Sequence, residues 1–145
     1  MSLQQLSERV REHFAAGFVK AVEWRGDLAI TVTRDTLHEV AQFLRDDPAM
    51  DFDYIVHVSS VDWPDDEERF EVVYEFYSIR KRHRIRLKTR VPESDCVVDS
   101  LTDLWKGADF MVLDGNPLDD IKVLKRVSFV MKNGRIIKLS GKGSE

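Results

Sequence analysis

Apolar residues recur at helical spacing in two early parts of the chain. The first stripe consists of Leu3, Leu6, Val10 and Phe14. The second stripe consists of Leu37, Val40, Ala41 and Leu44. This spacing predicts two amphipathic helices. We expect the first to end near Gly17, and the second to start at a cap on Thr33 or Asp35 and to end at Asp46-Asp47-Pro48.

Shorter apolar runs predict the strands of a sheet. Residues 19–24 and 28–32 flank a turn at Arg25-Gly26-Asp27, and residues 54–60 form a third strand. Residues 70–78 and 85–91 then alternate between apolar and polar positions, which predicts an antiparallel pair.

The register of that antiparallel pair depends on the loop that joins its strands. With a long loop over residues 79–84, Phe76 is expected opposite Leu87 and Val72 opposite Val91. The same register pairs Glu75 with Lys88 and Tyr77 with Arg86, as the alternation of the two strands requires.

The last third of the chain contains one more apolar stripe and a strong hairpin signal. The stripe consists of Val97, Val98, Leu101, Leu104 and Trp105, and it predicts a third helix capped by Asp95 or Ser94. We expect that helix to end at Gly107. Further on, the chain has a turn signal at 114–117, a short helical pattern at 118–124, and two strands at 127–131 and 135–139 around Asn133-Gly134.

These elements predict an α+β fold: a mainly antiparallel sheet with three helices packed on it, plus a C-terminal β-hairpin. The apolar residues of the hairpin need cover from water. We expect the hairpin to add to the edge of the main sheet, and the alternative is a homodimer formed through the tail.

Composition narrows the class of protein. The chain has 145 residues, 43% of them hydrophobic, and a net charge of −4, which suits one soluble domain and disfavours nucleic acid as a partner. Cys96 is the single cysteine, so no disulfide forms within the chain. The polar start is unlike a signal peptide, and no apolar run reaches the roughly 20 residues that cross a bilayer. We therefore expect a cytoplasmic protein.

The sequence offers no recognisable active site. The four histidines are His13, His38, His57 and His83, and they lie on separate predicted elements without metal-ligand spacing. The acidic loop at residues 62–68 lacks the glycine-punctuated ligand pattern of a calcium loop. No phosphate-binding glycine loop, nucleophile elbow or cysteine cluster is present. We expect no catalytic, cofactor-binding or metal-binding residues.

Basic residues are concentrated between positions 80 and 90. The favoured interpretation is a solvated sheet face, balanced by Glu75 and the acidic loop. The alternative is a docking surface for an acidic partner, since guanidinium groups bind carboxylates in bidentate fashion. The candidate interface consists of Arg80, Arg82, Arg84, Arg86, Lys88, Arg90 and Trp105.

An ordered series of segments resembles the C-subunit family of bacterial NADH-quinone oxidoreductase, also called respiratory complex I. The segments lie at residues 44–48, 52–61, 70–78, 85–91 and 99–105, and the resemblance covers about residues 2–111. It implies a subunit of the hydrophilic arm on the cytoplasmic side of the inner membrane, beside the quinone-site subunit, without a cofactor or catalytic residues of its own. The family's later signature positions have no counterpart here.

Residues 108–139 resemble a different family, the C-terminal end of metal-dependent amidohydrolases. The matching pieces are Ala108-Asp109-Phe110, the 113–118 turn, and the strands around Asn133-Gly134. The hypothesis that follows is a hybrid, with a domain like the complex I C-subunit at residues 1–110 and an amidohydrolase-like hairpin extension at 111–145. The alternative is a divergent protein of a single family.

Two functions follow from these resemblances. The first is a non-catalytic accessory subunit, peripheral to the membrane, that assembles with other hydrophilic-arm subunits, chiefly the quinone-site subunit. The alternative is an orphan protein-binding module, truncated and unable to join the complex.

Overall fold

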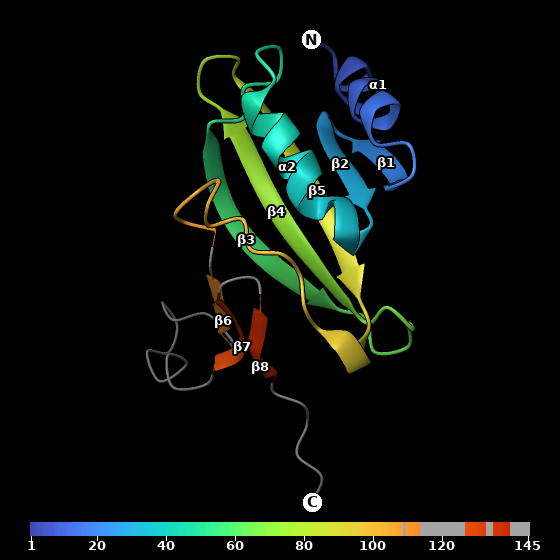
Figure 1. Cartoon of the computed structure of the whole chain (residues 1–145), viewed down its shortest axis with the longest axis vertical. Coiled ribbons are helices and arrows are strands. Elements are labelled where there is room, and N and C mark those ends of the chain that lie inside the picture. Colours follow the sequence, from blue (N-terminus) through green and yellow to red (C-terminus); the bar gives the residue numbers. More distant parts are fainter. Residues whose placement is uncertain (109, 114–126, 133–134, 140–145) are drawn as a thin grey trace, which may run out of the picture.

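The main body of the protein is a five-stranded sheet with two helices on one face, as the computed structural model shows (Figure 1). The structure describes residues 1–108, 110–113, 127–132 and 135–139. The strands are β1 (Phe18–Trp24), β2 (Asp27–Val32), β3 (Tyr54–Asp62), β4 (Phe70–Ser78) and β5 (His83–Val91).

The strand order is β1-β2-β5-β4-β3. Three of the neighbouring pairs are antiparallel, but β2 and β5 run parallel, with Ile30 beside Leu87. The sheet is therefore mixed, which refines the expectation of a mainly antiparallel one. The parallel pair arises because the helix and the two strands between β2 and β5 return the chain to the same end of the sheet (Figure 1).

Both predicted N-terminal helices are present, as α1 (Leu3–His13) and α2 (Leu37–Asp46). A capping box starts α1: the Ser2 hydroxyl accepts a hydrogen bond from the Gln5 N–H, and the Gln5 side chain accepts one from the Ser2 N–H. A 3-10 turn over Arg34–Thr36 precedes α2. The N-cap of α2 is Thr36, so the predicted caps on Thr33 and Asp35 are wrong.

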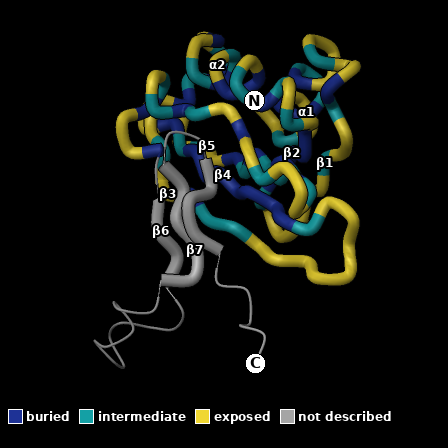
Figure 2. Tube along the Cα trace, turned by 60° about the horizontal axis from the view of Figure 1, so that its bottom comes forward, coloured by how far each residue is buried: buried dark blue, intermediate teal, exposed yellow. Residues whose placement is uncertain are grey.

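The core lies between the helices and the sheet (Figure 2). Leu6 and Val10 of α1 are fully buried, as is the whole predicted stripe of α2. On the sheet, the apolar side chains of β4 and β5 meet these helical stripes, and Tyr74 and Leu87 have no exposed surface. Helical and strand periodicity thus predicted the buried residues of this part correctly.

The register between β4 and β5 differs from the prediction by two residues. Phe76 pairs with Ile85 and Glu75 with Arg86, so the expected Phe76–Leu87 and Glu75–Lys88 pairs are wrong. The loop is shorter than expected because Arg82 adopts a φ of 53° and its N–H bonds the Ser78 carbonyl at 2.8 Å. A shift of two residues keeps every side chain on its predicted face.

The third predicted helix does not form. A 3-10 turn over Glu93–Asp95 leads into irregular turns that reach Ala108. Asp, Cys, Val and Ser at positions 95–100 are poor helix formers, and the Ser100 hydroxyl instead accepts the Thr102 N–H. The apolar stripe is still used, because Leu101 and Trp105 are buried. The fold thus has two α-helices within the described residues, where three were expected.

The described parts of the tail form a second sheet of three antiparallel strands, β6 (Phe110–Leu113), β7 (Val127–Lys132) and β8 (Arg135–Leu139). The predicted hairpin of β7 and β8 is confirmed. Its expected addition to the edge of the main sheet is wrong, because β7 and β8 belong with β6 to a separate three-stranded sheet. The predicted turn at 114–117, the helix at 118–124 and the turn residues Asn133-Gly134 lie outside the described residues.

Candidate partner-binding face of the sheet

The sheet face turned away from α1 and α2 carries the basic strand singled out from the sequence. In β5, alternate residues point into the core, and Ile85, Leu87 and Val91 are buried. The residues between them lie on the opposite, open face; they are Arg84, Arg86, Lys88 and Arg90. The structure therefore brings four of the seven candidate interface residues together.

Each of these four side chains has a carboxylate partner in the chain. Arg84 Nε lies 2.8 Å from Asp27 Oδ1, and Arg86 Nε lies 3.4 Å from Glu75 Oε2. The other two pairs are Lys88 with Glu71 at 3.0 Å and Arg90 with Asp66 of the acidic loop at 2.8 Å. The predicted balance by Glu75 and the acidic loop is confirmed, and most of the open face is close to neutral.

Two of those carboxylates are nearly buried. Glu71 and Glu75 are 6% and 9% exposed, because they lie on β4 near the middle of the sheet and longer side chains surround them. Removing a carboxylate from water costs free energy, which a nearby cation offsets. Arg86 and Lys88 of β5 lie within ion-pair distance of Glu75 and Glu71, so part of the basic character of β5 stabilises the sheet itself.

The remaining candidate residues lie elsewhere. Arg80 is in the loop between β4 and β5 and pairs with Asp51 at 2.7 Å. Arg82 is exposed in the same loop. Trp105 lies on the helix side of the sheet, where it is buried with its ring centroid 4.5 Å from that of Phe76. The structure thus separates Trp105 from the basic face.

The acidic loop is fixed at its base by an arginine. Arg69 donates two hydrogen bonds to Asp62, at 2.7 and 3.0 Å, and one to Glu93 at 3.0 Å. The hydrogen bond from Arg69 holds the pKa of Asp62 below its usual value. No three His, Cys, Asp or Glu side chains in the described part of the chain gather closely enough to hold a metal ion.

Cys96 is a half-buried residue whose thiol donates to the carbonyls of Pro92 and Glu93. Burial, together with the nearby charges of Glu93 and Asp95, raises the pKa of this thiol. A raised pKa keeps the sulfur protonated and unreactive at neutral pH.

The surface is hollowed in several places. A groove of about 600 Å³ lies at the end of the sheet where the β1–β2 turn meets the β4–β5 loop, with Gly26, Tyr77 and Arg82 in its lining. A second groove of about 240 Å³ runs along the open face, lined in part by Val22 and Trp24. Trp24 was missed as a functional candidate, although its alternation with Lys20 and Val22 on one strand face was visible in the sequence.

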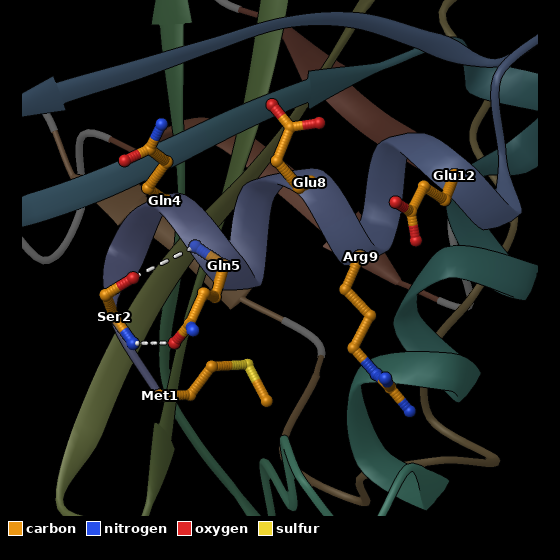
Figure 3. Close-up of a pocket in the computed structure, with 7 residues that line it drawn as sticks. All are labelled: Met1, Ser2, Gln4, Gln5, Glu8, Arg9 and Glu12. Carbon is orange, nitrogen blue, oxygen red and sulfur yellow. Dashed lines mark hydrogen bonds between the residues drawn. The ribbon is translucent and has the colours of Figure 1, made fainter.

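A third hollow, of about 750 Å³, runs along the outer surface of α1 (Figure 3). Its lining is mostly polar, and Arg9 extends from it toward α2 (Figure 3). Arg9 ends on Asp47, the residue that follows α2, with Nη2 and Nε at 2.6 and 2.9 Å from the same carboxylate oxygen. This contact holds the two helices together.

The fold and this face define a small α+β domain with a helix-covered side and an open, charge-paired side. The chain belongs to the family described as the respiratory-chain NADH dehydrogenase 30 kDa subunit, whose sequence model matches residues 30–112. The match runs from within β2 through β5 and the irregular segment into β6.

Relatives named as the C-subunit of NADH-quinone oxidoreductase agree with this assignment. The protein of Roseiflexus sp. (strain RS-1) is 42% identical over 103 residues, which make up 71% of this chain and 59% of the relative. The protein of Citrifermentans bemidjiense is 37% identical over 103 residues, 71% of this chain and 63% of the relative. The chain thus spans about three fifths of the length of these relatives.

Solved structures show the same fold. A trypsin-resistant fragment of Nqo5 superposes with a TM-score of 0.62 at 29% identity, covering 74% of this chain and 84% of the fragment. A chain of an archaeal membrane-bound sulfane sulfur reductase superposes with a TM-score of 0.60, covering 72% of this chain and 60% of that one. At 19% identity, the second likeness concerns the fold alone. None of the described helices is long and apolar enough to cross a membrane.

Proposed function

We propose that this protein is a non-catalytic accessory subunit of the hydrophilic arm of NADH-quinone oxidoreductase. In this role it assembles with the quinone-site subunit at the cytoplasmic face of the inner membrane and supports electron transfer from NADH to quinone. The observation that carries the proposal is the family match over residues 30–112, which contains most of the buried core of the sheet.

The structure supports a docking role for this domain. Among the described residues, its core is closed by α1, α2 and the irregular segment before β6, and neither helix covers the other side of the sheet (Figure 1). The Nqo5 fragment with the same fold is described as trypsin-resistant. A self-contained domain with an open sheet face suits a protein that acts through contacts.

The proposal also divides the chain into a domain like the complex I C-subunit at residues 1–110 and an extension at 111–145 that resembles the amidohydrolase tail. The family match ends at residue 112, and β6, β7 and β8 form a sheet of their own. Both observations support a change of character close to residue 110.

Co-purification from native membranes tests the proposed function. The chain is tagged at its N-terminus, membranes are solubilised gently, and the recovered proteins are identified by mass spectrometry. We expect the quinone-site subunit together with other hydrophilic-arm subunits. An equally expressed, tagged cytoplasmic protein serves as the control for non-specific capture.

Recovery of the chain without any arm subunit would overturn the proposal. Recovery with a different, stoichiometric protein would favour a binding module that acts outside the complex.

A further inference from the structure

One end of the open sheet face combines exposed aromatic rings with unpaired guanidinium groups. We propose that this turn-end surface, made of Trp24, Arg25, Tyr54, Tyr77, Arg82 and Arg84, is the docking site for an acidic segment of a partner protein. The inference rests on the proposed function, since it assigns the surface and the chemistry through which the chain joins its partner.

The residues come together because one row of side chains crosses the whole sheet. Trp24 pairs with Asp27 across the β1–β2 hairpin, and Asp27 bonds Arg84 of β5 at 2.8 Å. Arg84 pairs with Tyr77 of β4, which pairs in turn with Tyr54 of β3. All five strands therefore contribute to one continuous row on the open face.

Charge distinguishes this end from the rest of the face. Within the described residues, Arg25 and Arg82 have no carboxylate within 4.0 Å, whereas the four basic residues of β5 on this face are all paired. The two unpaired arginines sit at the tips of neighbouring turns, the β1–β2 turn and the β4–β5 loop. Two net positive charges thus border the groove at this end.

Both arginines have an unusual backbone conformation. Arg25 and Arg82 have φ values of 52° and 53°, in the left-handed region that non-glycine residues adopt rarely. Asn or Gly would fit these positions with less strain, so arginine is present there at a conformational cost. That cost is consistent with a role for the guanidinium groups beyond forming the turn.

Exposed aromatic side chains complete the surface. Trp24 and Tyr54 are 63% and 52% exposed, and the Arg25 guanidinium lies 4.4 Å from the centre of the Trp24 ring. Trp, Tyr and Arg are the residues that contribute most to binding energy at protein interfaces. The groove of about 600 Å³ beside them is lined by Leu3, Val56 and Tyr77 as well as by Glu75, His83, Arg82 and Arg84, so it offers a partner side chain both apolar and charged contacts.

These features favour an acidic peptide segment over other ligands. Two unpaired arginines offer few contacts to a nucleic-acid backbone, which proteins bind through many phosphate contacts. A second copy of the chain would bring the same two arginines against themselves in a two-fold contact. A suitable partner segment has carboxylates that pair with Arg25 and Arg82. It also has an apolar residue that enters the groove.

Charge reversal in the assembled protein tests the inference. The variant is R25E/R82E in the tagged chain, and the matched control is K20E/K106E, which changes the charge equally at exposed positions away from this end. When the salt concentration is raised during washing, we expect the first variant to retain at most about one tenth of the partner that the wild-type chain retains. The control should retain the wild-type amount. Equal melting temperatures of the two variants exclude misfolding as the cause.

The outcomes separate this inference from the proposed function. If the wild-type chain recovers no arm subunit, the proposed function fails. If the wild-type chain recovers the subunits and R25E/R82E recovers as much as K20E/K106E, only the docking surface is wrong.

A photo-crosslinking residue at Trp24 in the assembled complex gives an independent measurement. We expect it to label a partner peptide that contains Asp or Glu. Labelling of lipid or nucleic acid, of a peptide without carboxylates, or of nothing would overturn the inference.

Discussion

The contact between Arg9 and Asp47 leads to the sharpest stability prediction. The Asp47 side chain is 6% exposed, and its carboxylate accepts two hydrogen bonds from Arg9 and one from the Ala49 N–H at 2.8 Å. Burial alone would raise the pKa of Asp47, but these hydrogen bonds outweigh it and hold the pKa below its usual value. The charged carboxylate is therefore part of what joins α1 to α2.

The magnitude follows from the groups that lose partners. Arg9→Ala removes the cation and leaves a nearly buried carboxylate with backbone donors only, which should cost about 1–3 kcal/mol of unfolding free energy. Asp47→Asn keeps the size of the side chain but removes its charge, and should cost about 1–2 kcal/mol. Because the two changes break the same contact, the double variant should lose less than the sum, with a coupling of about 1 kcal/mol.

Urea denaturation at pH 7 gives the unfolding free energy of the wild type, the two single variants and the double variant. A group whose pKa is lowered on folding stabilises the protein above its unfolded pKa, near 4, and the stabilisation is lost as pH falls through the lower folded value. The difference between wild type and Asp47→Asn should therefore shrink below about pH 4. Strictly additive losses, or a difference that does not change with pH, would refute the role of the pair.

Three further predictions concern single buried sites. Leu87→Ala should lower the unfolding free energy by about 2–5 kcal/mol, because the side chain is fully buried; an unchanged melting temperature would contradict its place in the core. Gly17→Ala should destabilise by about 1–3 kcal/mol, because its Cβ would lie 2.2 Å from Thr36 Oγ1, and adding Thr36→Ala should recover only part of the loss in the same denaturation assay, because the Cβ of residue 36, at 2.7 Å, would still be too close. Thr89→Val should raise the melting temperature slightly, because the buried hydroxyl has no hydrogen-bond partner among the described residues; a fall of more than about 1 kcal/mol would indicate that it has one.

Predictions from the sequence were most accurate where periodicity alone determines which face of an element is buried. The stripes of α1 and α2 and the alternating residues of β4 and β5 were assigned to the correct faces, because burial follows the repeat of the element. The predicted third helix at residues 95–105 is wrong. Consecutive turns bury apolar residues that have the same spacing as a helical stripe. Periodicity identifies which residues are buried, but local propensity decides between a helix and a string of turns.

Register and strand neighbours were harder to predict for a different reason. The pairing of Phe76 with Ile85 depends on Arg82 adopting a positive φ, which its residue type disfavours. The parallel neighbour of β5 is β2, a choice set by the whole fold and by no local signal. For the candidate interface, the alternation of β5 predicted which basic side chains lie on the open face. The carboxylates that pair with these side chains come from three other parts of the chain, so β5 alone could not predict them.

The parallel pairing of β2 with β5 also has a consequence for the order in which the protein folds. The β4–β5 hairpin and the β1–β2 hairpin each join neighbouring parts of the chain and can form early, whereas Ile30 meets Leu87 only after a long loop closes. We expect this closure to limit the folding rate. Arg25 and Arg82 belong to different hairpins, so they come together only at this late step, and a partner that requires both would bind the finished domain and ignore its precursors.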